Sequence, residues 1–382
     1  MTAPGLPAGV ERAAVIDTLA IEENARRFVE LARSAQVMAV VKADGYGHGA
    51  VETARAAVRG GATWLGVAHI SEAIALREAG ISAPILAWLH TPASAFATAI
   101  EQGVALAVSG PELEQIAAAA RESGTAARLH VKVDTGLGRN GAGPGGLDEL
   151  VARLASLQED GSVVVDGVMT HLAVADNPSR GAETDARRDA FLAAIDDLAA
   201  AGVSPALRHV ANTAATLSRP DLHFDLVRVG IGLYGLGPFA DGIAGLRPAM
   251  SVRTRLSHIK TLPPGHGDSY GYDYVAERAV TVGLVPLGYA DGVPRRSRSA
   301  SVTIGGREFP VIGRIAMDQL VVDLSRASLD INDRPRVGDV VELFGAGGTT
   351  ADDWARAAGT INYEIVTRIG PRVPRLFVAD RH

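Results

Sequence analysis

The sequence QVMAVVKADGYGHGAVETARAAVRGGATWLGVAH, residues 36–69, contains one complete unit of the pattern that decides the fold. An apolar run, QVMAVVK, is followed by a glycine-rich turn, by an amphipathic helical stretch that ends in two glycines, and by a second apolar run, TWLGVAH. Short runs that are apolar throughout are typical of strands covered on both faces. The stretch therefore predicts a strand, a helix and a second, parallel strand.

The same unit repeats up to about residue 245. Apolar runs alternate with helical stretches, and the runs lie at 36–42, 63–69, 84–90, 103–109, 127–134, 163–172, 207–212 and 225–235. Eight such strands in one continuous stretch favour a (β/α)8 barrel of the TIM type, which typically needs about 250 residues. A doubly wound open sheet uses the same units and is the competing interpretation.

The pattern changes after residue 246. Alternating apolar and polar runs now follow one another with glycine and proline turns between them, and a single helical stretch, TADDWARAAG, comes near the end. Such runs are typical of antiparallel strands. We therefore expect an α/β protein with two domains: a barrel over residues 14–246 and a mainly antiparallel β domain over 247–382, with which residues 1–13 could pack.

Composition excludes several classes of function. The formal net charge is −6 and no cysteine is present, which argues against a nucleic-acid surface and excludes disulfides and thiolate metal sites. The first ten residues lack the basic and apolar regions of a signal peptide. The uncharged stretch 79–100 is broken by prolines, so it predicts buried core rather than a membrane span. We expect a cytoplasmic protein with no metal, nucleic-acid or membrane partner.

Polar residues stand where the predicted barrel strands end. Chemistry in such barrels gathers at the carboxyl ends of the strands. The residues at these positions are Lys42, Lys132, Asp134, His171, Asn212, Thr213, Arg228 and Gly230. Any one of them could be a satisfied core residue, but the whole group favours a single site.

Lys42 is the most informative of these residues. Burial lowers the pKa of a lysine, and a neutral amine is the nucleophile that forms a Schiff base with an aldehyde cofactor. The alternative is a buried ion pair with a barrel carboxylate. The sequence RVGIG, 228–232, offers backbone N–H groups to an anion, and Asn212 and Thr213 open a short helix, so a phosphate site is plausible.

The segment GAGPGG, 141–146, fits the G-x-G-x-x-G pattern of dinucleotide-binding proteins. That motif must follow a strand directly. Here the preceding strand has ended at Asp134, and Pro144 interrupts the loop. We therefore assign no dinucleotide site to this segment.

Nine segments in order carry a resemblance to a known family. They are AVVKADGYGHG, KVDTGLGRNG, VMTHLAVAD, HVANTAATL, VRVGIGLYGL, SYGYDY, PLGYADGVPRR, VIGRIAMDQ and INYEIVTRI. Together they resemble bacterial alanine racemases, which are pyridoxal-phosphate enzymes with a barrel and a C-terminal β domain. The resemblance covers about residues 14 to 375.

The resemblance implies two catalytic bases. Lys42 matches the lysine that binds the cofactor and acts as one base, and Tyr270 matches the opposite base, which comes from the partner subunit of a homodimer with shared active sites. Two bases on opposite faces can remove a proton from one side and return it on the other. His171 and Arg228 match the residues that poise the tyrosine. Arg228 also matches the partner of the pyridine nitrogen, to which arginine cannot hand a proton.

The resemblance also implies the remaining site residues. Those on the cofactor, mostly at its phosphate, are Tyr46, Asn212, Thr213, Gly230, Ile231 and Tyr363, with threonine at 213 where serine is usual. Lys132 matches a lysine carbamylated by CO2, whose new carboxylate orients Arg139 toward the substrate carboxylate or the cofactor's phenolic oxygen. Met317 and Asp318 match the substrate-carboxylate side. The entrance is matched by Tyr289, Arg295 and Tyr363.

The implied function is an isomerase that interconverts L- and D-alanine and supplies D-alanine for peptidoglycan. The first alternative is another barrel-type pyridoxal-phosphate enzyme, either a racemase for serine, lysine or ornithine or a decarboxylase. Decarboxylases of this fold carry a cysteine acid, and broader racemases often carry disulfides, whereas this chain has no cysteine. The second alternative is a non-enzymatic barrel that binds the cofactor. Tyr270 in a full second domain argues against that alternative.

Overall fold

The computed structural model describes residues 6–143, 145–239, 243, 245–297, 299–325 and 334–379, so Pro144 of the glycine-rich segment lies outside the described residues. By its internal contacts the chain divides into two units. Unit 2 comprises Ile21–Gly45 and Ala50–Leu246. Unit 1 comprises the residues up to Ala20, the short segment Tyr46–Gly49 and the residues from Arg247 onward.

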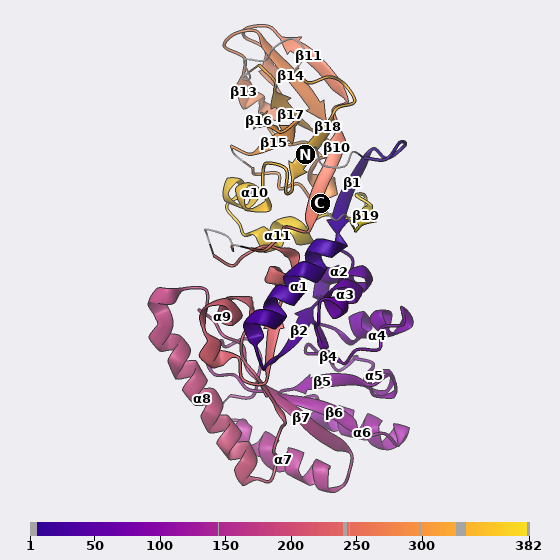
Figure 1. Ribbon diagram of the computed structural model, residues 1–382, viewed down its shortest axis with the longest axis vertical. Helices are drawn as coiled ribbons and strands as arrows, with labels where there is room; N and C mark the ends of the chain where they lie inside the picture. Colours follow the sequence, from indigo (N-terminus) through magenta and orange to yellow (C-terminus); the bar gives the residue numbers. More distant parts are fainter. Residues whose placement is uncertain are drawn as a thin grey trace. The chain divides into compact units, whose positions relative to one another are not determined.

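Unit 2 contains an all-parallel eight-stranded sheet in the order β8-β7-β6-β5-β4-β3-β2-β9, with helices between successive strands (Figure 1). The strands are β2 (Gln36–Val40), β3 (Trp64–Val67), β4 (Ile85–Ala87), β5 (Val104–Val108), β6 (Ala127–Lys132), β7 (Val163–Met169), β8 (Leu207–His209) and β9 (Leu226–Val229). The helices are α1 (Thr18–Ala32), α3 (Ala50–Arg59), α4 (Ile70–Glu78), α5 (Phe96–Glu101), α6 (Leu113–Ser123), α7 (Leu147–Glu159), α8 (Gly181–Ala200) and α9 (Thr213–Ser218).

The sheet of unit 2 closes on itself. The backbone N–H of Asp225 donates to the carbonyl of Arg208 at 3.1 Å, and the N–H of Arg228 donates to the carbonyl of Ala211 at 2.9 Å. These bonds join the β8 and β9 segments, which are the two ends of the strand order. Closure confirms the predicted barrel and excludes the doubly wound open sheet.

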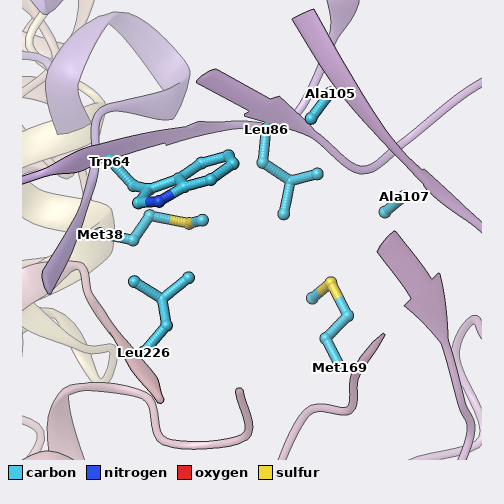
Figure 2. Close-up of a cluster of buried hydrophobic side chains, with 7 residues drawn as sticks. All are labelled: Met38, Trp64, Leu86, Ala105, Ala107, Met169 and Leu226. Carbon is cyan, nitrogen blue, oxygen red and sulfur yellow. The ribbon is translucent and has the colours of Figure 1, made fainter. Parts of the chain in front are cut away.

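The barrel interior is packed with side chains. A buried apolar cluster draws one or two residues from each of six strands, and its members are Met38, Trp64, Leu86, Ala105, Ala107, Met169 and Leu226 (Figure 2). Trp64 is large, whereas the two alanines opposite are small, as interdigitating layers require. The filled interior leaves the carboxyl ends of the strands as the place for chemistry.

Unit 1 is built on a nine-stranded sheet in the order β11-β14-β17-β16-β15-β18-β10-β1-β19, with a separate β12-β13 pair. Its strands are β1 (Arg12–Asp17), β10 (Met250–Arg255), β11 (His258–Leu262), β12 (Gly267–Asp268), β13 (Tyr274–Val275), β14 (Val280–Val285), β15 (Ser301–Ile304), β16 (Arg307–Ile312), β17 (Leu320–Asp323), β18 (Val340–Phe344) and β19 (Arg375–Val378). All pairs in it are antiparallel except β1 with β19, which confirms the mainly antiparallel second sheet.

Unit 1 contains one helix more than was expected, and its sheet includes a strand from the start of the chain. The predicted helix is α10 (Ala351–Ala358), but a second helix, α11 (Asn362–Thr367), follows it in the described chain. It was missed because it has six residues and its N-cap, Ile361, makes no side-chain cap. The strand β1, from the start of the chain, lies between β10 and β19. Within the described residues, none of the helices has the length and apolar character needed to span a membrane.

Candidate active site

Lys42 lies two residues after the end of β2 and precedes a left-handed turn of the backbone. Ala43, Asp44, Gly45 and Tyr46 have φ values of 52°, 52°, 60° and 53°. For residues with a side chain this conformation costs about 1–2 kcal/mol each. The turn must therefore be held by other contacts. Within unit 2 the N–H of Gly45 donates to the carbonyl of Val41 at 2.8 Å.

Glu72 at the start of α4 is a main contact of this turn. One of its oxygens accepts the N–H of Ala43 at 2.6 Å, and the other accepts the N–H groups of Ala68 and His69 at 2.8 and 3.0 Å. Glu72 was not among the predicted site residues. Its only sequence signal is its place three residues after the N-cap of α4, where acidic residues usually serve the helix itself.

Cationic groups crowd the ends of the barrel strands. Burial, and next the charge of Arg139, lower the pKa of the Lys42 amine, which Glu72 only partly offsets. Burial and the guanidiniums of Arg139 and Arg228 lower the pKa of Lys132 to about 8. Burial and the same cations lower the pKa of His171 to about 3. These residues therefore share one electrostatic site, and its lysines are biased toward the neutral form.

Arg228 on β9 is buried, and the described chain offers it no carboxylate. Its Nη1 donates to the carbonyl of His209 at 2.6 Å and faces His209 Nδ1 at 3.2 Å. Its Nη2 donates to the carbonyl of Thr170 at 2.7 Å and lies 3.3 Å from His171 Nδ1. Within the described residues these hydrogen bonds all come from the two Nη atoms, and none comes from the Nε–H.

The segments after β8 and β9 meet at Thr213. The Thr213 hydroxyl accepts the N–H groups of Gly230 and Gly232 at 3.0 and 3.4 Å, and the Asn212 side chain accepts the N–H of Ala215 at 3.0 Å. Ile231 is buried and begins a 3-10 turn. Asn212, Thr213, Gly230 and Ile231 thus lie together in the segments that follow β8 and β9.

Other predicted site residues belong to unit 1. The rings of Tyr46 and Tyr363 lie 6.2 Å apart. Burial, and next the neighbouring Tyr363, raise the pKa of Tyr46. Tyr270 stands in a tight turn after β12, with 74% of its surface exposed in the single chain. Ser269 before it has a φ of 61°, so the turn is locally strained. Arg295 is exposed as well.

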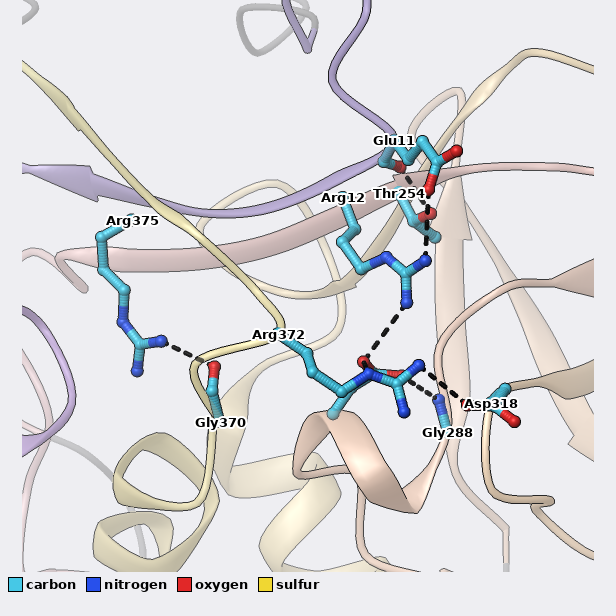
Figure 3. Close-up of polar contacts among 9 residues, drawn as sticks. Glu11, Arg12, Thr254, Gly288, Asp318, Gly370, Arg372 and Arg375 are labelled. Atoms are coloured by element: carbon cyan, nitrogen blue, oxygen red, sulfur yellow. Dashed lines mark hydrogen bonds and ion pairs between the residues drawn. The ribbon is translucent and has the colours of Figure 1, made fainter.

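Tyr289, one of the predicted entrance residues, and the predicted substrate-carboxylate residues Met317 and Asp318 lie on two segments that bond to each other. The N–H of Tyr289 donates to the carbonyl of Ala316 at 3.1 Å, and the N–H of Ala290 donates to the carbonyl of Met317 at 2.9 Å. The Asp318 carboxylate accepts from Arg372 at 2.8 Å (Figure 3). The two backbone bonds place Tyr289 next to Met317 and Asp318.

Asp291 holds this region and was also missed. Its carboxylate is 1% exposed, and one oxygen accepts the N–H of Gly288 at 2.9 Å. The other oxygen lies 3.3 Å from guanidinium nitrogens of both Arg12 and Arg372. Nothing in the local sequence GYADG distinguishes this acid from an ordinary turn aspartate, because its partners come from both ends of the chain.

A closed barrel whose strand ends carry a desolvated lysine and a buried arginine defines an enzyme of the TIM-barrel class. The alanine racemase N-terminal domain family matches residues 16–238, and the alanine racemase C-terminal domain family matches residues 249–377. The chain belongs to the alanine racemase family, which confirms the resemblance of the nine segments.

Individual relatives agree over the whole length. The alanine racemase of Frankia casuarinae is 47% identical, and the alignment covers 98% of each chain. That of Thermobifida fusca is 49% identical over 95% of this chain and 96% of its own. The crystal structure of the alanine racemase from Streptomyces lavendulae superposes with a TM-score of 0.93 at 44% identity, covering 98% of this chain and 99% of that one.

Proposed function

We propose that this protein is a pyridoxal-phosphate-dependent isomerase that interconverts L- and D-alanine. One observation carries the proposal beyond family membership: the barrel mouth gathers Lys42, Lys132, Arg139 and Arg228, which lower one another's pKa values or those of their neighbours. Such a cluster needs an anionic ligand, and a lysine biased toward its neutral form is suited to hold an aldehyde.

The residues present fit pyridoxal phosphate. The Nε–H of Arg228 would face the ring nitrogen, and Lys42 would hold the aldehyde carbon. Thr213, Gly230 and Ile231, with Tyr46 and Tyr363, would contact the phosphate. When bound, the cofactor supplies an electron sink that makes the α-proton of the amino acid acidic. Because arginine never gives up its proton, this chain would moderate that sink and so limit side reactions.

Lys42 and Tyr270 would exchange the α-proton. Racemisation requires one group to take the proton from one face and another to supply a proton to the opposite face. Lys42 serves the first face, and its lowered pKa raises the fraction of free amine available as base. Tyr270 serves the other face, contributed by a second copy of the chain. The exposure of its phenol in the single chain supports a role at a homodimer interface.

Lys132 would become a carbamate. Its amine, with a pKa of about 8, would add CO2 and release a proton, which places a carboxylate beside Arg139. This change replaces a like-charge contact by an attractive one. Arg139 would then be oriented toward the substrate carboxylate. Intact-mass measurement of the native protein tests this step.

Met317 and Asp318 would bind the substrate carboxylate through backbone N–H groups. The Asp318 carboxylate is already engaged by Arg372 and would repel another carboxylate. Tyr289, Arg295 and Tyr363 would narrow the entrance and favour a small substrate. The product D-alanine would serve peptidoglycan synthesis, and a cytoplasmic location stays a prediction.

The first test is proton NMR of L-alanine in D2O with the purified protein and pyridoxal phosphate, coupled to a chiral assay. Loss of the α-proton signal together with formation of D-alanine is expected. Turnover of serine, lysine or ornithine in place of alanine would keep the cofactor and overturn the substrate. Inertness toward all four amino acids would contradict the proposed function.

Two substitutions test the division of roles. Lys42→Ala should abolish the visible absorbance of the Schiff base with pyridoxal phosphate, and a retained chromophore that borohydride reduces would contradict the assignment. Tyr270→Ala should stop α-proton abstraction from L-alanine and leave some exchange from D-alanine. Equal losses from both enantiomers would show that Tyr270 does not serve a single face.

A further inference from the structure

The barrel interior contains two histidines that the proposed reaction does not use. His130 on β6 and His209 on β8 are both fully buried, and His130 Nδ1 lies 2.7 Å from His209 Nε2. The His130 ring also packs edge-on against Trp64 of the apolar cluster, with centroids 5.4 Å apart. The pair thus lies between the apolar cluster and Arg228.

The backbone makes space for this pair. Strand β7 lies between β6 and β8, and its residue opposite His130 is Gly167. A Cβ at Gly167 would lie 2.4 Å from His130 Nδ1, so only glycine allows the two rings to meet across β7. The register of β6 and β7 also shifts between Leu129 and His130. The absence of a side chain at Gly167 therefore makes the contact between the two rings possible.

The direction of the hydrogen bonds follows from Arg228. Arginine has donors only, so His209 Nδ1, 3.2 Å from Arg228 Nη1, must be an acceptor. His209 is then neutral with its proton on Nε2, which donates to His130 Nδ1. His130 in turn carries its proton on Nε2. The same reasoning places the proton of His171 on Nε2, because its Nδ1 faces Arg228 Nη2 at 3.3 Å.

A buried histidine pair destabilises the fold if its only role is to fill the barrel interior. Among the described residues, His130 Nε2 has no hydrogen-bond partner, and a buried donor left unpaired is destabilising. An aliphatic pair would fill the interior without that loss. The pair does, however, give Arg228 a fixed hydrogen-bond acceptor, because His209 Nδ1 faces Arg228 Nη1.

We propose that His130 is a positioning residue that acts through His209 to fix the guanidinium of Arg228. By accepting the Nε2 proton of His209, His130 holds that ring in the tautomer that Arg228 requires. The Nε–H of Arg228 then keeps a constant direction toward a ligand at the barrel mouth. The identity of that ligand, pyridoxal phosphate, rests on the proposed function. The tautomers of the two histidines do not.

The test compares His130→Leu with His130→Asn. Leucine removes the acceptor, whereas the Oδ1 of asparagine can take the place of Nδ1. Leu86→Met is the control for a change of interior packing. Each protein is loaded with pyridoxal phosphate labelled with 15N in the ring, and the ring-nitrogen resonance is recorded. The 15N resonances of labelled histidines, the thermal midpoint, kcat and KM are measured in parallel.

We expect His130→Leu to shift the ring-nitrogen resonance and to lower kcat between roughly ten- and a hundredfold with KM little changed, as a misdirected group does. His130→Asn should restore both, and Leu86→Met should change neither. An unchanged resonance in His130→Leu, or equal losses in the leucine and asparagine variants, would overturn the inference.

The histidine spectra separate this inference from the proposed function. If the parent protein binds no pyridoxal phosphate, the proposed function fails. The histidine spectra then test by themselves whether His130 sets the tautomer of His209. An unprotonated Nδ1 in His209 that becomes protonated in His130→Leu would support the positioning role. A parent His209 protonated at Nδ1 would refute it.

Discussion

Substitution of Asp291 by asparagine should destabilise unit 1 by far more than a single lost charge on the surface. Both carboxylate oxygens of Asp291 act as acceptors, one for the N–H of Gly288 and the other for Arg12 and Arg372. An asparagine has only one oxygen. Its NH2 group must therefore face either a backbone N–H or two guanidiniums, and either arrangement sets donor against donor.

The magnitude follows from the burial of each partner. A buried N–H that loses its acceptor costs about 1–3 kcal/mol. The side chains of Arg12 and Arg372 are 21% and 43% exposed, so their guanidiniums can be rehydrated, and each 3.3 Å contact contributes only about 0–1 kcal/mol. We therefore expect Asp291→Asn to lower the free energy of unfolding by about 2–4 kcal/mol.

The assay is urea unfolding followed by far-UV circular dichroism at a fixed protein concentration, together with hydrogen exchange of peptides over residues 286–293. The exchange data show whether the loss is local to the Gly288 turn. Glu308→Gln, an exposed acid in β16 of the same unit, is the control and should change the stability by less than about 0.5 kcal/mol. If Asp291→Asn behaves like this control, the donor–donor argument is wrong.

Three further predictions concern other parts of the chain. Gly47 and Gly265 both have a φ of 79°, but a Cβ at Gly47 would lie 2.5 Å from the carbonyl oxygen of Val366, whereas one at Gly265 meets nothing within 4 Å. In the urea assay, Gly265→Ala should therefore lower the free energy of unfolding by about 1 kcal/mol and Gly47→Ala by about 2–4 kcal/mol. Equal losses would show that the backbone strain at positive φ, and not the clash with Val366, determines the cost. Because burial lowers the pKa of His130 to about 3, only the unfolded chain takes up its proton below pH 6.5, and stability falls as the pH falls. Between pH 7 and 5, the free energy of unfolding of His130→Asn should therefore fall by about 2 kcal/mol less than that of the parent protein, as measured by urea titration. If the free energies of the two proteins fall in parallel, His130 is not buried in its neutral form. Glu72→Gln places an NH2 group against at least one of the three backbone N–H groups that Glu72 accepts, so it should lower the free energy of unfolding by about 1–3 kcal/mol and with it the thermal midpoint. An unchanged midpoint would contradict the role of Glu72 in holding the turn.

The sequence predicts the barrel well because its strands are buried on both faces and read as continuous apolar runs. Lys42, Lys132 and Arg228 are recognisable because a charged residue at the end of such a run is unusual. His130, by contrast, reads as an ordinary strand residue, and only the geometry brings it to His209. Glu72 and Asp291 serve backbone N–H groups far along the chain or across a turn, so no local pattern distinguishes them.

The strand β1 has a consequence for the time course of synthesis. All the barrel strands lie between residues 36 and 229, so the barrel can close as soon as they have left the ribosome. The partners of β1 are β10 and β19, which begin at Met250 and Arg375. At the usual rate of translation, β1 remains without its first partner for roughly ten to fifty seconds. During that interval the N–H and C=O groups of β1 are unpaired, so this strand is open to pairing with a wrong partner.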